Sequence, residues 1–427
     1  MNKKVLIITY YWPPAGGPGV QRWLKFVKYL PEFGVEPIVY CPENPSYPLL
    51  DDNLVKEVSD KITIIKHPIF EPYQLASLFS KKKTKTIASG LINTKKQSLV
   101  EKLLLFIRGN YFIPDARKFW VKPSVKYLSK YIKENAIETI ITTGPPHSLH
   151  LIGLQLKKQL NINWIADFRD PWTTIGYHDK MKLSNVSQQK HKVFEKEVLE
   201  TADSILVTSP STKTEFEVIT DKPVNVITNG FDDVNMKSLP LDTKFTLSHI
   251  GSLLTGRNPK VLWDSISELL QENNDFKLNF ELKLIGAVSN DVLASIKNSG
   301  LVNHVNILGY VSHDEAQKQQ RISQVLLLIE IDSPITKCII PGKLFEYLQS
   351  NRPILGFGPD KADFKAIISE TNTGSSYSYN AKEKELIKVK IMSYFEAYKN
   401  GSLKANGIGI QQYHRKNLTG KLVTILP

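Results

Sequence analysis

The sequence predicts an α/β protein with two doubly wound domains, each a parallel sheet covered by helices on both faces. Three observations predict it. Short apolar runs without polar alternation recur along the chain, as expected of strands that are buried on both faces. Most runs lead into a turn rich in glycine or proline and then into a helix-like pattern. The alternation of strands and helices starts again near the middle of the chain.

Length and composition indicate a globular protein of more than one domain. At 427 residues the chain exceeds what one ordinary core organises, and 41% hydrophobic with 23% charged residues is typical of globular proteins. Two cysteines, Cys41 and Cys338, argue against a disulfide framework or a cysteine zinc site. The apolar residues after Lys4 stop at Trp12, too early for a signal peptide, and no run reaches the length of a membrane span. We therefore expect a cytoplasmic protein.

The first domain is expected over residues 1–235. Its opening strand, 4–12, leads into a loop with three glycines and three prolines within seven residues, more than a tight turn requires. A helix follows, with apolar residues at helical spacing from Val20 to Leu30. Further strands are expected at 36–41, 61–66, 139–142, 162–166, 204–208 and 223–228, and further helices at 125–134, 149–160 and 187–201.

The second domain is expected over residues 243–400, with the boundary between 232 and 243. Its strands are expected at 246–250, 278–285, 305–308, 324–331 and 352–358, with helices at 261–271 and 343–348. A last helix, 407–426 within the segment 401–427, is too polar to stand alone, so we expect it to pack back across both domains.

The candidate site residues follow strands, at the edge where doubly wound sheets bind ligands. Gly342 and Lys343 open a helix, whose N-terminus favours an anionic group such as a phosphate. Arg257 also precedes a helix, so it suits a diphosphate, although a surface cation is the plainer alternative. Glu346 suits hydroxyl groups, because a carboxylate accepts hydrogen bonds. A phosphate site beside a hydroxyl site predicts a sugar nucleotide as ligand.

In the first domain the candidates lie at 16–17, 147–150 and 167–170. The loop with Gly16 and Gly17 is expected to face a substrate. His147 suits a sugar hydroxyl, while His150 packs and no third ligand for a metal is evident. Arg169 and Asp170 are expected on the acceptor side. A local pair with arginine is the favoured interpretation of Asp167.

A basic insertion is expected at about 70–122. Between Lys81 and Lys96 it carries six lysines and no acidic residue, and apolar residues are interleaved with them. Such a segment suits an anionic membrane, each cation near the surface contributing about 1 kcal/mol. A solvated surface loop explains the same pattern equally well. Nucleic acid is disfavoured as the partner of a chain with net charge +13, because no aromatic residues alternate with the lysines as stacking platforms.

Four motifs carry a resemblance to a known family: TGPPHS at 143–148, DFRDPW at 167–172, NGFD at 229–232 and K-x-x-EYL at 343–348. With them the chain resembles retaining glycosyltransferases of family 4, which have the GT-B fold, and in particular bacterial enzymes of cell-surface polysaccharide and lipopolysaccharide synthesis. The resemblance covers nearly the whole chain.

The resemblance implies roles for the candidate residues. Gly16 and Gly17 are implied to lie on the acceptor side, where we also expect Arg169 and Asp170, and His147 is implied to contact the donor sugar. Asn229 is implied to lie near the crossover between the domains. For the donor, the resemblance implies Arg257 at the diphosphate, Gly309 and Tyr310 near the base and Glu346 at the ribose; we also expect Gly251, Ser252, Gly342, Lys343 and Leu344 to bind it. The residues that we expect to act in catalysis are His147, Asp170, Arg257 and Lys343.

Two positions depart from the family pattern. The first carboxylate of the family's E-x7-E pair falls on Cys338, while the second is Glu346. The usual arginine after the first strand of the second domain is Ser252, so Lys343 is expected to supply the missing phosphate cation.

The expected activity is transfer of a sugar from a nucleoside-diphosphate donor to an acceptor hydroxyl, with retention of configuration and with no cofactor or metal. The acceptor is expected to be a lipid-linked or cell-envelope saccharide. Two alternatives remain open: a nucleotide-sugar 2-epimerase of the same fold, and a non-catalytic nucleotide-sugar-binding protein.

Overall fold

The computed structural model describes residues 3–72, 99–174, 181–233 and 239–427. The lysine-rich stretch from Lys81 to Lys96 lies outside these residues. The chain forms two compact units: Met1–Asn229 together with Arg415–Pro427, and Gly230–His414. Within the described residues, no helix combines the length and the apolar character needed to cross a bilayer.

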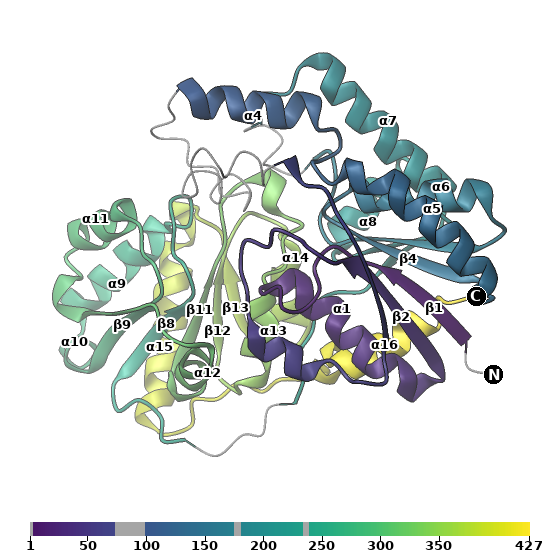
Figure 1. Ribbon diagram of the computed structural model, residues 1–427. Coiled ribbons are helices and arrows are strands. Elements are labelled where there is room, and N and C mark those ends of the chain that lie inside the picture. Colours follow the sequence, from purple (N-terminus) through teal and green to yellow (C-terminus); the bar gives the residue numbers. More distant parts are fainter. Residues whose placement is uncertain (1–2, 73–98, 175–180, 234–238) are drawn as a thin grey trace. The chain divides into compact units, whose positions relative to one another are not determined.

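The first unit contains a seven-stranded parallel sheet in the order β3-β2-β1-β4-β5-β6-β7 (Figure 1). This confirms the predicted doubly wound class for the first half of the chain. Its strands are β1 (Lys3–Ile8), β2 (Val35–Pro42), β3 (Thr63–His67), β4 (Thr139–Gly144), β5 (Asn163–Phe168), β6 (Ser204–Val207) and β7 (Val224–Val226). β1 ends at Ile8 rather than at Trp12, and the residues after it form the loop at the carboxyl edge.

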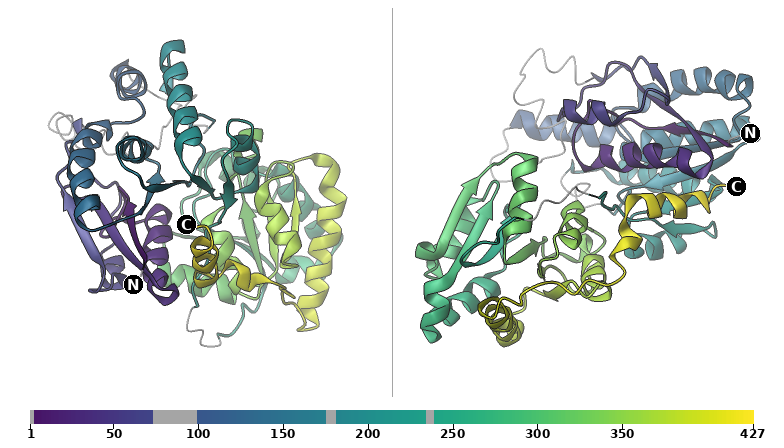
Figure 2. Two further views of the ribbon diagram at one scale, coloured as in Figure 1. Left: turned by 90° about the vertical axis from the view of Figure 1, so that its right-hand side faces the viewer. Right: turned by 90° about the horizontal axis from the view of Figure 1, so that it is seen from below.

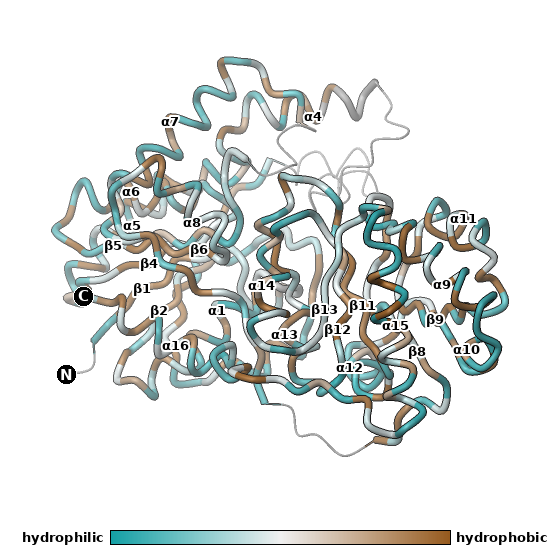
Figure 3. The backbone as a smooth tube through the Cα atoms, turned by 180° about the vertical axis from the view of Figure 1, so that it is seen from behind, coloured by the Kyte–Doolittle hydropathy of each residue, from teal (hydrophilic) through white to brown (hydrophobic). Residues whose placement is uncertain are grey.

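Helices cover both faces of this sheet. They are α1 (Pro18–Tyr29), α5 (Lys118–Glu134), α6 (Ser148–Gln159), α7 (Asn185–Thr201) and α8 (Pro210–Glu217), while α4 (Leu99–Tyr111) contacts the residues before α7. Successive residues of a strand point to opposite faces. Leu6 and Ile8 therefore pack in one core, and Val5 and Ile7 in the other. β1 is apolar from Val5 to Ile8, where both of its faces are buried, in agreement with the brown colouring of β1 in Figure 3.

The second unit contains a six-stranded parallel sheet in the order β10-β9-β8-β11-β12-β13. Its strands are β8 (Phe245–Ile250), β9 (Phe280–Ile285), β10 (Val305–Gly309), β11 (Val325–Ile329), β12 (Ile354–Phe357) and β13 (Gly374–Tyr377). Its helices are α9 (Lys260–Glu272), α10 (Asn274–Asn279), α11 (Asn290–Asn298), α12 (His313–Ile322), α13 (Gly342–Gln349), α14 (Asp363–Glu370) and α15 (Lys384–Lys399). The edge strand β13 escaped prediction because it is half-buried and has no apolar run.

The C-terminal helix is shorter than predicted. Residues 407–426 do not form one helix: Gly409 has φ +62°, which ends regular helical backbone, and α16 covers Arg415–Val423. α16 belongs to the first unit, where Leu418 and Leu422 enter the core beside α1 and Arg415 donates to Gln21 at 2.9 Å. Figure 2 shows α16 lying along α1. The part of this segment before Arg415 belongs to the second unit, which ends at His414.

Candidate functional site

Three neighbouring strands of the second sheet end in glycines with positive φ. Gly251 follows β8, Gly286 follows β9 and Gly309 closes β10, with φ values of +115°, +117° and +69°. Gly251 N–H donates to Ile285 O at 2.8 Å, and a Cβ on Gly286 would approach Gly251 O to 2.6 Å. Side chains are therefore excluded from part of this carboxyl edge. The edge presents bare backbone, against which a flat or anionic ligand can lie closely.

Lys343 projects from the start of α13 back toward the end of β8. Its ammonium group lies 3.3 Å from Ile250 O and 3.4 Å from His249 Nε2. Burial lowers the pKa of Lys343 to about 8, while the negative charges of Glu330 and Glu346 act in the opposite direction. A cation thus stands at the glycine-lined edge, close to the helix N-terminus that begins at Gly342.

His249 holds this ammonium group from within the sheet. Its side chain is fully buried, and Nδ1 lies 3.2 Å from Leu327 O. A carbonyl only accepts, so Nδ1 carries the hydrogen and Nε2 accepts from Lys343. Burial, reinforced by the positive charge of Lys343, keeps the pKa of His249 well below its usual range. The imidazole is therefore neutral, and it positions Lys343 without adding charge.

Arg257 pairs with a carboxylate that the sequence analysis did not single out. Its Nη2 lies 3.1 Å from Glu330 Oε2, and the two side chains are 26% and 4% exposed. Glu330 directly follows β11, and its own carbonyl accepts a hydrogen bond from the Tyr379 hydroxyl at 2.7 Å. The sequence did contain an indication of this role: Glu330 is the single acidic residue in the near-continuous apolar run 324–331.

The remaining candidates of the second unit differ in what they offer a ligand. Glu346 is half-buried and accepts from Gln320 Nε2 at 2.7 Å. Ser252 is exposed, and Tyr310 is 95% exposed. The side chain of Leu344 is fully buried in the core, and its N–H donates to Pro341 O at 2.9 Å, so this side chain is not exposed to a ligand. Its apolar character places it on the inner face of α13.

In the first unit, Asp167 is the centre of a buried cluster. Its carboxylate accepts from Arg22 Nη2 at 2.9 Å, Trp23 Nε1 at 2.7 Å and Thr143 Oγ1 at 2.8 Å. Burial alone would raise the pKa of Asp167, but the charge of Arg22 and these hydrogen bonds bring the pKa below its usual value. The predicted local pair with Arg169 is wrong, since the partner comes from α1.

The guanidinium group of Arg169 donates its hydrogen bonds to backbone carbonyls. This group donates to Gly19 O at 2.7 Å, to Gly144 O at 3.3 Å and to Pro145 O. It therefore joins the start of α1 to the end of β4, which leaves it few donors for an acceptor. Asp170 is half-buried, and its carboxylate makes no hydrogen bond to any residue that the structure describes. Burial raises the pKa of Asp170.

His147 lies at the start of α6 in an aromatic stack. Its ring is parallel to that of Trp172, with centroids 4.8 Å apart and an interplanar angle of 5°, and it is only 3% exposed. His150 is fully buried: Nδ1 contacts Thr142 Oγ1 at 2.9 Å and the ring stacks on Phe168 at 4.2 Å. Burial lowers the pKa of His150 to about 3, so this histidine is a neutral packing residue, as the sequence analysis expected.

The loop after β1 is held in place by its backbone. Gly16 N–H donates to Leu49 O at 2.9 Å, and a Cβ at Gly16 would lie 3.1 Å from the Leu49 side chain. Gly17 has φ +95° and precedes the first residue of α1. Asn229 is half-buried and ends the main segment of the first unit. These residues and the cations of the second unit thus belong to separate compact units.

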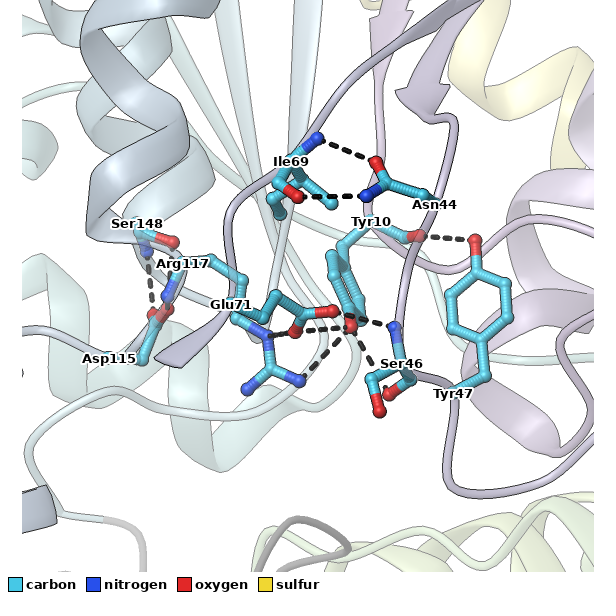
Figure 4. A network of polar contacts seen from close by, with 9 residues as sticks. All are labelled: Tyr10, Asn44, Ser46, Tyr47, Ile69, Glu71, Asp115, Arg117 and Ser148. Carbon is cyan, nitrogen blue, oxygen red and sulfur yellow. Dashed lines mark hydrogen bonds and ion pairs between the residues drawn. The ribbon is translucent and has the colours of Figure 1, made fainter. Parts of the chain in front are cut away.

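A network of polar contacts in the first unit includes residues from both ends of the predicted insertion (Figure 4). Glu71 Oε1 accepts from the Tyr10 hydroxyl at 2.8 Å and pairs with Arg117 Nε at 3.1 Å, while Oε2 accepts from Ser46 N at 2.6 Å. Asp115 accepts from Ser148 N at 2.9 Å. Glu71 and Arg117 stand at the two ends of the insertion. Their buried pair therefore fixes both ends against the sheet, whatever the insertion binds.

A cavity of about 280 Å³ in the first unit is lined by Trp12, Leu24, Val58 and Ile62, among others. It reaches Val35, the first residue of β2, and so lies by the amino end of that strand. None of the candidate site residues lines it. Ligands of doubly wound sheets bind at the opposite edge, so we assign this cavity no role in the site.

Comparison with known proteins identifies the architecture. No protein-family description matches the sequence, and no curated protein matches it. Solved structures do match over the whole chain. HepE of Anabaena, in complex with UDP and glucose, has 14% sequence identity and a TM-score of 0.59, with 99% of each chain covered. A glycosyltransferase from Rickettsia africae ESF-5 has 14% identity and a TM-score of 0.55, covering 99% of this chain and 94% of that one.

The chain has the GT-B fold. This confirms the expected fold class. A third neighbour is a putative UDP-N-acetylglucosamine 2-epimerase from Listeria monocytogenes, with 12% identity, a TM-score of 0.53, and coverage of 100% of this chain and 96% of that one. The GT-B fold thus carries more than one activity, and the activity of this chain has to be argued from its own residues.

Proposed function

We propose that the protein is a glycosyltransferase that moves a sugar from a nucleoside-diphosphate sugar to an acceptor hydroxyl. The observation that carries the proposal is the cation pair at the glycine-lined edge of the second sheet. Arg257 and Lys343 are both anchored, one by Glu330 and the other by His249 and Ile250 O. Anchored cations beside the N-terminus of α13 suit the diphosphate of a donor. Glu346, one turn further along α13, suits the ribose hydroxyls.

The chemical step requires stabilisation of a leaving diphosphate. The bond between the anomeric carbon and the phosphate oxygen breaks, and its electron pair stays on that oxygen. The acceptor oxygen bonds to the anomeric carbon, and its proton passes to the leaving phosphate. Arg257, Lys343 and the backbone N–H groups that open α13 stabilise the new negative charge, because they are held in place before reaction. Retention of configuration and independence of metal ions are part of the proposal.

The acceptor is proposed to be a lipid-linked or cell-envelope saccharide, reached from the cytoplasmic face of a membrane. Aromatic side chains at the ends of the insertion support this: Phe70, Tyr111 and Phe119 are 55%, 67% and 43% exposed, and Lys118 Nζ lies 5.4 Å from the Phe119 ring centroid. Exposed aromatic rings with cations suit a bilayer interface.

Membrane contact predicts that the protein floats with vesicles of phosphatidylglycerol, which is anionic, but not with vesicles of phosphatidylcholine, which has no net charge. Equal recovery of the protein with both kinds of vesicle contradicts the proposal.

The experiment that tests the activity is a two-stage screen. Thermal unfolding with UDP, GDP, ADP and their sugars identifies the donor, because a ligand that binds the folded state raises the apparent stability. Labelled donor is then incubated with lipid-linked acceptors, with and without EDTA. Transfer in both conditions supports the proposal. Stabilisation without transfer or hydrolysis favours a binding protein, an alternative that the absent carboxylate at Cys338 keeps open. Epimerisation of the donor without an acceptor favours the epimerase.

Donor binding should depend on pH through Lys343. Its pKa of about 8 means that the ammonium ion is present below pH 8 and is lost as the pH rises through 8. We expect the affinity for the nucleoside diphosphate to be constant from pH 7 to 7.5 and to fall above pH 8. Isothermal titration calorimetry measures this. Lys343→Arg should shift the fall to higher pH, because arginine stays charged. A wild-type affinity independent of pH up to 9.5 contradicts the assignment.

A further inference from the structure

The carboxylate of Glu330 stands among the cations proposed to bind an anion. One of its oxygens lies 3.1 Å from Arg257 Nη2, and its side chain is 4% exposed. Its negative charge also acts on Lys343, whose pKa it raises against the effect of burial. Its second oxygen, Oε1, makes no hydrogen bond to any residue that the structure describes. With His249 neutral, the two cations and Glu330 together carry one positive charge.

A carboxylate at this place weakens the binding of every anion, so it needs a reason. The carboxylate holds Arg257 in place, but a neutral group could do this as well. Lys343, for example, is held by the backbone carbonyl of Ile250. Glu330 differs from a neutral acceptor in its negative charge. The repulsion between this charge and a ligand increases with the negative charge that the ligand carries nearby.

The substrate and product of the proposed reaction differ in that charge. In a nucleoside-diphosphate sugar the terminal phosphate is esterified and carries one negative charge. In the free nucleoside diphosphate the terminal phosphate has a second ionisation near pH 6, so at pH 7.5 it carries nearly two negative charges. A neighbouring carboxylate therefore disfavours the product more than the substrate.

We propose that Glu330 is a specificity-determining residue that weakens the preference of this edge for a free diphosphate over an esterified one. The inference rests on the proposed function, and it adds that the ion pair with Arg257 keeps the leaving nucleoside diphosphate from being held too tightly. Glu330 thereby acts on product release as well as on the position of Arg257.

Isothermal titration calorimetry of Glu330→Gln at pH 7.5 tests the proposal. Glutamine has nearly the same shape and can still accept from Arg257, but it lacks the charge. We expect its affinity for the nucleoside diphosphate to rise, relative to its affinity for the nucleotide sugar, on the order of tenfold over the wild type. Glu385→Gln is the matched control: it removes an exposed carboxylate of α15 in the same unit that is not a candidate site residue, so the ratio of the two affinities should stay that of the wild type.

A second measurement replaces the nucleotide sugar by the β-methyl ester of the nucleoside diphosphate, which lacks the sugar but carries the same charge on its terminal phosphate. Glu330→Gln should raise the affinity for the nucleoside diphosphate more than the affinity for this ester. A ratio of affinities that is the same in Glu330→Gln and in the wild type overturns the inference, whichever esterified ligand is used. These results differ from a failure of the proposed function, in which the wild type binds neither nucleotide nor nucleotide sugar.

Discussion

Replacement of Arg257 by alanine should lower the rate of glycosyl transfer by about 10²–10³-fold, the loss seen when one fixed group that stabilises transition-state charge is removed. Two physical effects add. The leaving diphosphate loses a cation that is held before reaction, and Glu330 loses the partner 3.1 Å away that compensates its buried charge. The uncompensated carboxylate then repels the diphosphate.

Steady-state kinetics with the donor identified by the screen measures this effect. Arg257→Lys should recover part of the activity, since lysine restores the charge but not the planar geometry of the guanidinium group. Lys297→Ala removes an exposed cation from α11 of the same unit and should leave the rate unchanged. A rate for Arg257→Ala within threefold of the wild type would show that this arginine does not act on the diphosphate.

Replacement of Asp167 by alanine should destabilise the first unit by about 3–5 kcal/mol, the usual effect of removing one partner of a buried ion pair. Asp167 and Arg22 are fully buried at 0% and 1% side-chain exposure. Without the carboxylate, the charge of Arg22 stays buried with only the carbonyls of Ile227 and Thr228, at 2.8 and 2.9 Å, as acceptors. The donors of Trp23 and Thr143 lose their acceptor as well.

Urea-induced unfolding followed by tryptophan fluorescence measures this loss, because five of the six tryptophans lie in the first unit. Glu134→Ala is the control: it breaks the exposed pair with Lys130, whose side chains are 78% and 57% exposed, and should change the stability by less than about 0.5 kcal/mol. A change below about 1 kcal/mol for Asp167→Ala would contradict the structural role.

The same carboxylate gives a pH dependence with a definite sign. The pKa of Asp167 in the folded protein lies below its ordinary value of 3.8. Its contribution to the stability is therefore fully present above about pH 4, and it is lost as the pH falls through the lower pKa of the folded state. The stability difference between wild type and Asp167→Ala should be constant from pH 5 to 7 and should shrink below pH 4.

The sequence alone located most of the buried strands and the turns that follow them. Strands buried on both faces are mostly apolar, so β1 and β11 were visible as apolar runs. The turns after β8 and β11 marked the carboxyl edge of the second sheet, where Gly251, Arg257 and Lys343 lie. The half-buried edge strand β13 and the interruption of the last helix at Gly409 left no such pattern.

Only the tertiary structure decided which charges meet. Asp167 pairs with Arg22 rather than with Arg169, and Arg257 pairs with Glu330, because packing joins residues that are far apart in the chain. Local spacing carries no information about such partners. The periodicity of a sequence reports which face of an element is buried, whereas the pairing of charges depends on how strands are ordered in the sheet.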